Sequence, residues 1–386
     1  MSIFRRCAIL VILVVVGIAL AGCSKTVPVG AVVSETGAAA SYGGKVKKGL
    51  DLAVEEINAA GGLNGKSLEL VYRDDATNQD VGRQVTQELI DQVGVGAIIG
   101  AVSSTVTLAI APICEAEKII LLSPTASTPD ITQSGYYIFR TYPSDILEGT
   151  AMANFARDLG VERMAIFAVD NEFGAGLKEV FAGEFESRFR KIVRDVSFME
   201  GEAAGLSADF EALKEDQPDG IYIVAYVEDV AVIVQQAREA GLESVILTTS
   251  SVSDGDLVDL VGTAAENIVF PRASTFEFDS DKPEVREFVE AYRKKYGEDP
   301  DDFAAHGYDA VKVLLEGMQK GKSTHPDNIK VGLLAVSDYD GPSGRVAFDE
   351  HGDIIQYPRL FVVRQGRAIP YDRFKEEGGS LPVPGQ

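Results

Sequence analysis

The sequence predicts an α/β protein built from two doubly wound parallel-sheet lobes. Three observations indicate this fold class. Strands and helices alternate along most of the chain, the alternation starts again after a break near residues 141–144, and 386 residues suffice for about two domains. Hydrophobic residues form 46% of the chain and charged residues 25%, so the chain can bury substantial cores.

The first run of strands and helices spans residues 27–122. Val27–Val33 is apolar throughout, as expected for a buried parallel strand, and Val46, Leu50 and Val54 recur at helical spacing in the next segment. The same patterns predict the following order: helix 41–60, strand 68–72, helix 81–93, strand 95–99, helix 104–117, strand 119–122. Four β–α steps in a row favour a parallel sheet covered by helices on both faces.

The second run begins with a helix that Asp145 is expected to cap and that ends near Leu159. The predicted elements after it are strand 164–169, helix 177–185, strand 193–198, helix 208–216, strand 221–226, helix 229–240 and strands 245–249 and 268–270. Two long helices, 282–296 and 303–319, then precede a short helix and a hairpin-like stretch, 344–367. These last elements need a sheet to cover, so we expect them to return to the first lobe and cross back briefly.

The N-terminal segment has the features of a lipoprotein signal peptide, residues 1–22. A basic pair precedes an apolar run that ends at Leu20 and would span about 21 Å as a helix, less than the ~30 Å core of a bilayer. The small residues directly before Cys23 resemble a bacterial lipobox, which predicts cleavage there and a lipid on Cys23. The alternative is a short membrane anchor with an incidental cysteine.

Composition argues against several classes of function. With 36 Lys and Arg residues against 59 Asp and Glu residues, the net charge is −23, which disfavours a nucleic-acid surface. Three cysteines and three scattered histidines predict no metal site and no cofactor. After processing, Cys114 is the one unmodified cysteine, and its apolar neighbours predict inert burial.

Catalytic motifs are also missing from the sequence. Asn64–Ser67 resembles the end of a phosphate loop, but the first glycine of that motif is Ala60 here, and the segment follows a helix instead of a strand. There is no Gly-x-Ser-x-Gly elbow. Two doubly wound units without such residues indicate a protein that binds a ligand without chemistry, and not an enzyme.

A series of short segments, in order and spacing, resembles one family. The segments are 37–42, 49–58, 61–65, 74–76, 99–100, 103–104, 122–124, 139–140 and 308–310. They are similar to the branched-chain (Leu/Ile/Val) amino-acid binding proteins of ABC transporters, a branch of the type I periplasmic binding proteins, and the resemblance covers nearly all of 27–370. It implies two lobes, a ligand between them and hinge closure.

The resemblance also implies how the chain is divided. Three crossings, near 141–144, 271–275 and 352–358, would form the hinge. The expected N-terminal lobe is 25–143 plus about 274–354, the C-terminal lobe is 144–272 plus about 355–374, and the tail is 375–386.

Hydroxyl side chains at the ends of predicted strands are the candidate polar contacts. Ser103 and Ser104 follow a strand and begin a helix, where hydroxyls and N–H groups can hold a carboxylate. From the residues alone they could equally be N-caps and turn residues. The resemblance implies that Ser104, Thr125 and Ser127 grip the α-carboxylate and ammonium of an amino acid.

Aromatic side chains are the candidate walls of the pocket. Tyr42, Phe173 and Tyr226 match family positions that close on an apolar ligand side chain, and the alternative is ordinary surface aromatics at strand ends. One position departs from the family. A glutamate that commonly follows strand 245–249 and pairs with the ammonium is replaced here by Ser250-Ser251.

A buried ammonium without a carboxylate is costly, so the loss of this glutamate leaves two readings open. Asp254, Asp170 or Glu228 could substitute for it, or the ligand could lack an ammonium.

We therefore expect an extracytoplasmic solute-binding lipoprotein that captures a small polar ligand, first of all an aliphatic amino acid, for an ABC importer. Its expected partners are that ligand, an ABC permease and the membrane, through the lipid on Cys23, at the periplasm or outer cell surface, and it is expected to be a monomer. The alternatives are a ligand sensor of the same fold that signals to a membrane partner, and a binding protein for amides or other carboxylates.

Overall fold

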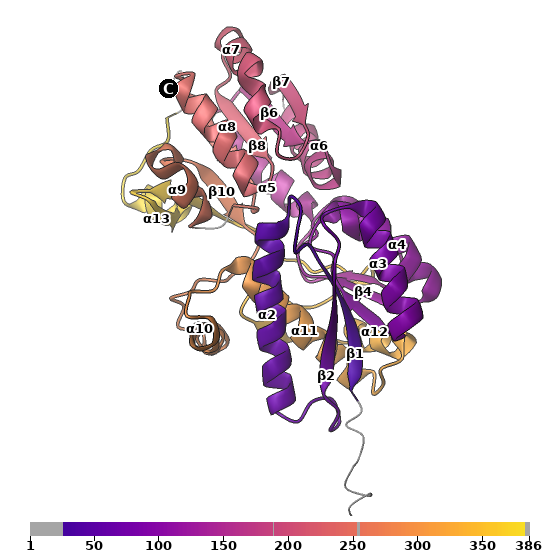
Figure 1. Ribbon diagram of the computed structural model, residues 1–386. Coiled ribbons are helices and arrows are strands. Elements are labelled where there is room, and N and C mark those ends of the chain that lie inside the picture. The colour runs from indigo at the N-terminus through magenta and orange to yellow at the C-terminus, as the bar shows by residue number, and fades with distance from the viewer. Residues whose placement is uncertain (1–25, 188, 253–254, 383–386) are drawn as a thin grey trace, which may run out of the picture.

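The computed structural model describes residues 26–187, 189–252 and 255–382, so the expected signal peptide and Cys23 lie outside the described residues. The chain forms two lobes, each around its own β-sheet (Figure 1). We call the five-stranded sheet and its helices the first lobe, and the seven-stranded sheet and its helices the second lobe. None of the described helices combines the length and the apolar composition that crossing a membrane requires.

The first lobe contains an all-parallel sheet in the order β2-β1-β3-β4-β5. Its strands are β1 (Val27–Val33), β2 (Leu68–Asp74), β3 (Ala97–Ile99), β4 (Ile120–Ser123) and β5 (Ile138–Arg140). The predicted parallel sheet is confirmed. Strand β5 was not predicted, because three residues are too few to show a periodic pattern.

Helices cover both faces of this first sheet, as a doubly wound fold requires. The helices of the first lobe are α2 (Ala40–Ala59), α3 (Gln79–Glu88) with a π-helical end (Leu89–Val93), α4 (Ser104–Glu117), α10 (Pro283–Tyr296), α11 (Asp302–Lys320) and α12 (Pro326–Leu334). The last three come from the final third of the chain, and α10 and α11 lie beside α2 from its start (Figure 1). Helices α2 and α11 cross closely because Gly49 and Gly307 face backbone there, so a Cβ on Gly49 would lie 2.0 Å from a carbonyl oxygen of α11.

The sheet of the second lobe repeats the strand order of the first. Its strands are β6 (Arg163–Val169), β7 (Lys191–Phe198), β8 (Gly220–Val224), β9 (Val245–Thr248), β10 (Val269–Arg272), β13 (Arg359–Arg364) and β14 (Arg367–Pro370). Strands β7-β6-β8-β9-β10 are parallel and correspond to β2-β1-β3-β4-β5. Strands β13 and β14 extend the edge in antiparallel pairing.

The predicted hairpin 344–367 is wrong as a single unit. The structure has a small ribbon of β11 (Tyr339–Gly341) and β12 (Gly344–Val346), and a separate hairpin of β13 and β14. Gln365 and Gly366, with φ values of 51° and 72°, form the tight turn of the second hairpin. Two consecutive positive φ angles match a type I′ turn, which joins antiparallel strands.

The helices of the second lobe are α5 (Asp145–Asp158), α6 (Glu172–Glu186), α7 (Ser207–Asp216), α8 (Val227–Glu239), α9 (Asp256–Val261) and α13 (Tyr371–Glu376). Two details differ from the prediction. Ser144, not Asp145, caps α5, because the Ser144 hydroxyl accepts the Ile146 N–H and Asp145 is already helical. Strand β8 ends at Val224, so Tyr226 is the N-cap residue of α8.

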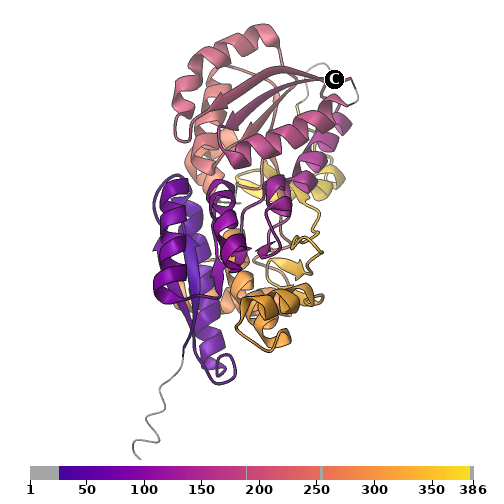
Figure 2. The ribbon, with the colours of Figure 1, turned by 90° about the vertical axis from the view of Figure 1, so that its right-hand side faces the viewer.

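The chain passes between the lobes three times, within residues 141–144, 273–282 and 347–358. Figure 2 shows the two lobes stacked one on the other. Arg140, at the end of β5, and Asp353 form a buried ion pair that ties the first and third connections together.

Candidate functional site

A small pocket lies between the lobes at the carboxyl ends of both parallel sheets. Most of its lining residues follow β1, β3 and β4 in the first lobe and β6, β8 and β9 in the second. Parallel α/β sheets bind ligands at this edge, next to the point where the strand order reverses. The pocket has a cavity volume of about 50 Å³, several times the roughly 10–15 Å³ that one water needs.

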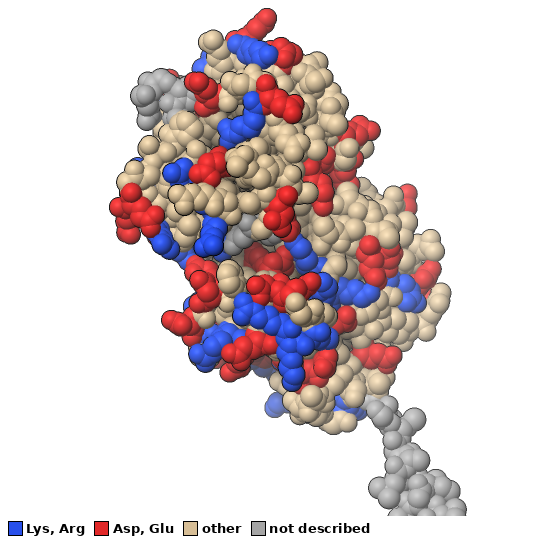
Figure 3. Space-filling view, turned by 60° about the vertical axis from the view of Figure 1, so that its left-hand side comes forward, with Lys and Arg blue, Asp and Glu red and all other residues tan. Residues whose placement is uncertain are grey.

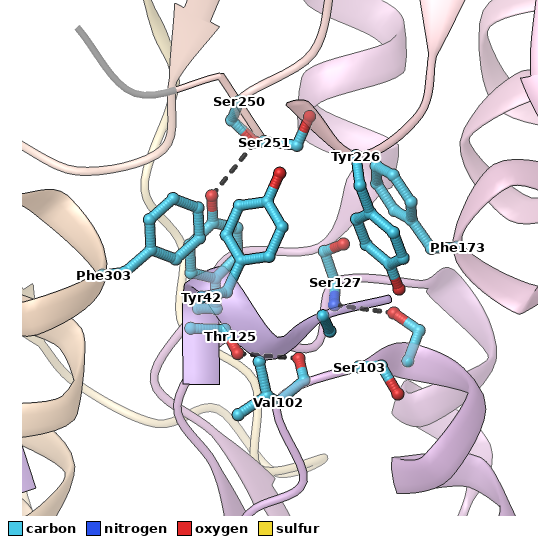
Figure 4. Close-up of a pocket in the computed structure, with 13 residues that line it drawn as sticks. Tyr42, Val102, Ser103, Thr125, Ser127, Phe173, Tyr226, Ser250, Ser251 and Phe303 are labelled. Atoms are coloured by element: carbon cyan, nitrogen blue, oxygen red, sulfur yellow. Dashed lines mark hydrogen bonds between the residues drawn. The ribbon is translucent and has the colours of Figure 1, made fainter. Parts of the chain in front are cut away.

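All eight residues predicted to contact a ligand line this one pocket (Figure 4): Tyr42, Ser103, Ser104, Thr125, Ser127, Phe173, Tyr226 and Ser250. Five further lining residues were not predicted: Ala39, Val102, Tyr142, Ser251 and Phe303. Tyr142 lies in the first connection between the lobes, and Phe303 begins α11, far away in sequence. Tertiary packing alone brings these two rings to the pocket. Ala39, Val102 and Ser251 each adjoin a predicted segment, which is the signal that could have found them.

Two hydroxyl groups on the first-lobe side, those of Ser104 and Thr125, are left with different hydrogen-bonding capacities by their contacts within the protein. The Ser104 Oγ accepts the backbone N–H groups of Ser127 and Thr128, at 3.2 and 3.3 Å, so its own hydrogen remains for an acceptor. Thr125 donates its hydrogen to the Val102 carbonyl at 2.7 Å, so its oxygen remains for a donor. The site therefore offers a donor and an acceptor side by side.

Ser127 has the same polarity as Thr125, because its Oγ donates to the Asp145 carboxylate at 3.0 Å. Ser103 caps α4 by accepting the Val106 N–H at 3.2 Å, which is the structural role that the sequence left open for it. The N-terminus of α4 nevertheless lies at the pocket, where the helix dipole favours an anion. A carboxylate would fit at Ser104 and an ammonium at Thr125 and Ser127.

Aromatic rings from both lobes enclose the rest of the pocket (Figure 4). Phe173 and Tyr226 stack with ring centroids 5.9 Å apart, while Tyr42 lies 5.5 Å from Tyr226 and 4.8 Å from Phe303. The Tyr42 Oη accepts the Val227 N–H at 2.7 Å and so joins α2 of the first lobe to α8 of the second. Burial raises the pKa of the Tyr42 phenol, so this ring stays neutral.

Two buried carboxyl groups lie immediately behind the pocket wall. Asp145 accepts the Ser127 hydroxyl, and Glu148 accepts the backbone N–H of Ser250 at 3.0 Å. Tyr142 donates to the Ser250 hydroxyl at 3.0 Å. Sequence reasoning missed Glu148, because its burial depends on how α5 packs against the second sheet.

The two described carboxylates that the sequence suggested as replacements for the family glutamate do not line the pocket. Asp170 and Glu228 are exposed and lie outside its lining. Asp254 lies outside the described residues. The prediction that Asp170 or Glu228 replaces the family glutamate therefore receives no support from this arrangement of the lobes.

A larger, charged cavity of about 510 Å³ adjoins the pocket and shares Ser250 and Phe303 with it. Figure 3 shows the hollow between the lobes, with acidic and basic side chains around it. Lys45 of the first lobe pairs there with Asp256 of the second and, at 2.9 Å, with Asp301. The pair with Asp256 joins the two lobes, and the pair with Asp301 lies within the first lobe.

Other features singled out in the sequence lie away from this site. Cys114 is fully buried in the apolar core, as predicted, and burial raises the pKa of its thiol to about 12. Asn64 and Gly65 form a tight turn with φ values of 52° and 79°, as predicted, and not a phosphate loop. In the described part of the chain, no three His, Cys, Asp or Glu side chains are grouped so that they could hold a metal ion.

Comparison with known proteins identifies relatives over almost the whole chain. A family model described as "Periplasmic binding protein" matches residues 26–368. The leucine-, isoleucine-, valine-, threonine- and alanine-binding protein of Pseudomonas aeruginosa is 28% identical over 328 residues, which cover 83% of this chain and 84% of that protein.

Two solved structures share the fold. The leucine-binding protein LivK of Thermotoga maritima has a TM-score of 0.83 and 29% identity, covering 93% of this chain and 99% of its own. The branched-chain amino acid transporter substrate-binding protein LivJ of Streptococcus pneumoniae, in complex with isoleucine, has a TM-score of 0.81 and 28% identity, covering 89% and 98%. These similarities agree with the resemblance that the sequence motifs suggested.

Proposed function

The chain belongs to the periplasmic binding protein family, and from this membership we propose that it captures a free α-amino acid with an aliphatic side chain in the pocket between its lobes. Like its relatives, it is an extracytoplasmic solute-binding protein that serves an ABC importer, and it is not an enzyme. The relatives named above bind leucine, isoleucine, valine, threonine or alanine.

The main support for this proposal is that one pocket hydroxyl is free to donate a hydrogen bond while others are free to accept one. Ser104 offers a hydrogen-bond donor to a carboxylate, while Thr125 and Ser127 offer acceptors to an ammonium. An α-amino acid presents these two charged groups on one carbon. The stacked rings of Phe173 and Tyr226 line the same pocket and offer an apolar wall to its side chain.

We further propose that Cys23 carries a lipid that holds the mature chain, residues 23–386, at the membrane, and that the mature protein is a monomer. The basic pair, the apolar run and the small residues before Cys23 support the lipid anchor. A single acyl chain binds membranes only marginally, so a lipoprotein needs more than one chain for stable attachment.

A thermal-shift panel tests the ligand class directly. The experiment uses purified residues 24–386 with amino acids and with the same skeletons lacking the amine or the carboxylate. A ligand at 100 times its Kd adds about 2.7 kcal/mol to the free energy of unfolding, so a true ligand gives a clear rise in Tm. Stabilisation by leucine, isoleucine or valine supports the proposal. A rise in Tm only with acids that lack the amine would contradict it.

A further inference from the structure

Among the described residues, the pocket lining offers no charge for the ligand's ammonium. Its thirteen described lining residues include hydroxyl, aromatic and aliphatic side chains but no acidic or basic one. Hydroxyl oxygens alone leave a buried ammonium without a counter-charge, which is energetically costly. An amino-acid ligand therefore requires an anion close behind the wall.

Two carboxyl groups on the first turn of α5 meet this requirement. Glu148 accepts the Ser250 N–H on the second-lobe side of the pocket, and Asp145 accepts the Ser127 hydroxyl on the first-lobe side. They are 5% and 1% exposed, and each lies one hydrogen bond away from a lining residue. At positions i and i+3 of one helix they are also neighbours.

We propose that Glu148 supplies the counter-charge for the ligand's ammonium from behind Ser250, and so makes the pocket prefer an amino acid to the same acid without its amine. This inference rests on the proposed function, because it concerns the recognition of that ligand class. Glu148 acts through the wall at Ser250, so it is a specificity-determining residue and need not touch the ligand. In this role Glu148 would do the work of the family glutamate, whose position after strand 245–249 is occupied by serine in this chain.

Asp145 is the carboxyl group bonded to Ser127, but the charge of Glu148 raises the pKa of Asp145, so Glu148 is the group of the pair that ionises more readily. Arg140 faces Asp145, but its guanidinium is held in two hydrogen bonds by Asp353. On the sheet side, the Tyr222 phenol of β8 is buried near both groups, and Tyr142 of the first connection lies near both as well. Both phenols are neutral, since burial raises their pKa.

Burial and mutual repulsion keep both carboxyl groups from ionising together. Burial raises the pKa of Glu148 to about 7, and burial and the charge of Glu148 raise the pKa of Asp145. His306, whose ring lies 4.7 Å from that of Tyr142, is neutral because burial lowers its pKa. Near neutral pH Glu148 is therefore only partly ionised, and an ammonium close to it would favour its ionised form.

This linkage gives the proposal a signature that a purely structural glutamate would lack. An ammonium near Glu148 lowers the pKa of the carboxyl group, so binding of leucine near pH 7 releases protons. Affinity for leucine should rise from about pH 6 to about pH 8, while its own ammonium stays charged. The same skeleton without an amine, 4-methylpentanoate, brings only a negative charge and should bind with proton uptake.

The experiment is titration calorimetry of residues 24–386 with L-leucine and with 4-methylpentanoate, in two buffers of different ionisation enthalpy. We expect proton release with leucine for the wild type and none for Glu148→Gln. We also expect Glu148→Gln to weaken the binding of leucine at least tenfold. The affinity for 4-methylpentanoate should stay unchanged or increase. Asp309→Asn is the matched control, because it removes another buried carboxyl with a pKa of about 7, on α11 and outside the pocket lining.

The outcomes separate this inference from the proposed function. If leucine binds the wild type and Glu148→Gln equally, with the same proton count, Glu148 is not the counter-charge although the function stands. If no amino acid binds the wild type, the proposed function itself fails. If the variant does not fold, the wild-type proton count decides alone: release with leucine supports the proposal, and no exchange overturns it.

Discussion

Arg140 and Asp353 form a bidentate ion pair in the interior of the hinge, with N–O distances of 2.7 and 2.9 Å. The same guanidinium donates to the carbonyl oxygens of Ser127 and Thr128, at 3.0 and 2.8 Å. One side chain therefore connects the first connection, the third connection and the loop that presents Ser127 to the pocket. Hinge geometry and pocket geometry are coupled through Arg140.

Asp353→Ala should strongly destabilise the protein. It leaves the fully buried Arg140 without its carboxylate, and breaking a buried pair in this way costs about 3–5 kcal/mol. Urea denaturation monitored by circular dichroism measures the change in the free energy of unfolding. The control is Glu377→Ala, which breaks the exposed pair with Arg373 and should leave stability nearly unchanged. Equal effects of the two variants would contradict this view of the hinge.

The polarity of the hydroxyls predicts that two variants respond to different ligand groups. Ser104→Ala should weaken the binding of leucine and of 4-methylpentanoate alike, by roughly tenfold or more, because both ligands carry the carboxylate. Thr125→Val should weaken the binding of leucine and leave that of 4-methylpentanoate unchanged, because Thr125 offers a hydrogen-bond acceptor to the ammonium. Calorimetric titration of both ligands against both variants checks this. The assignment is refuted if each variant affects the two ligands equally.

Tyr42→Phe should weaken ligand binding because it removes a contact that stabilises the closed arrangement of the lobes. The phenol oxygen accepts the Val227 N–H across the pocket at 2.7 Å, so its removal leaves a donor unsatisfied when the lobes are closed. A loss of about 1 kcal/mol, or fivefold in Kd, is expected. Tyr72→Phe is the control, since its hydroxyl bonds Asp51 within the first lobe. An unchanged Kd for Tyr42→Phe would argue against this contact in the bound state.

Asp309 should make stability fall as pH rises. Burial raises the pKa of this carboxyl to about 7, above its unfolded value near 3.8, so the folded state holds the proton more tightly. Its stabilising effect is therefore complete below about pH 4 and is lost as pH rises to about 7, at up to about 1.4 kcal/mol per pH unit. Asp309→Asn should flatten this dependence in urea denaturation at a series of pH values. An identical slope in both proteins would exclude the effect.

Cys23→Ala should release the protein from the membrane. The lipobox-like segment predicts that the lipid on Cys23 is the anchor, and the described residues include no helix suited to span a bilayer. Membrane fractionation of cells that express the full chain, with mass spectrometry of the mature N-terminus, measures this. Wild-type protein that lacks a lipid at Cys23 would contradict the prediction.

Much of the fold was predictable because its signals are local. The apolar run of β1 and the helical spacing in α2 are read from consecutive residues, and Ser104 was placed correctly as the start of α4. Strand β5 and the hairpin of β13 and β14 carry no such signal, because the partner strand defines them.

The pocket residues that were predicted could also be named from local signals. Strand ends and helix starts must meet at one edge of a parallel sheet, so the hydroxyl residues there could be named from the sequence together with the family resemblance. Phe303, Tyr142 and Glu148 reach the site through the packing of α11, the first connection and α5. No local pattern carries that information.

The most direct test of the central claim is equilibrium dialysis of purified residues 24–386 against radiolabelled L-leucine. The account predicts one bound leucine per chain, displaced by unlabelled isoleucine or valine and not by an equal concentration of 4-methylpentanoate. Failure to retain leucine, or equally effective displacement by 4-methylpentanoate, would contradict an amino-acid site between the lobes.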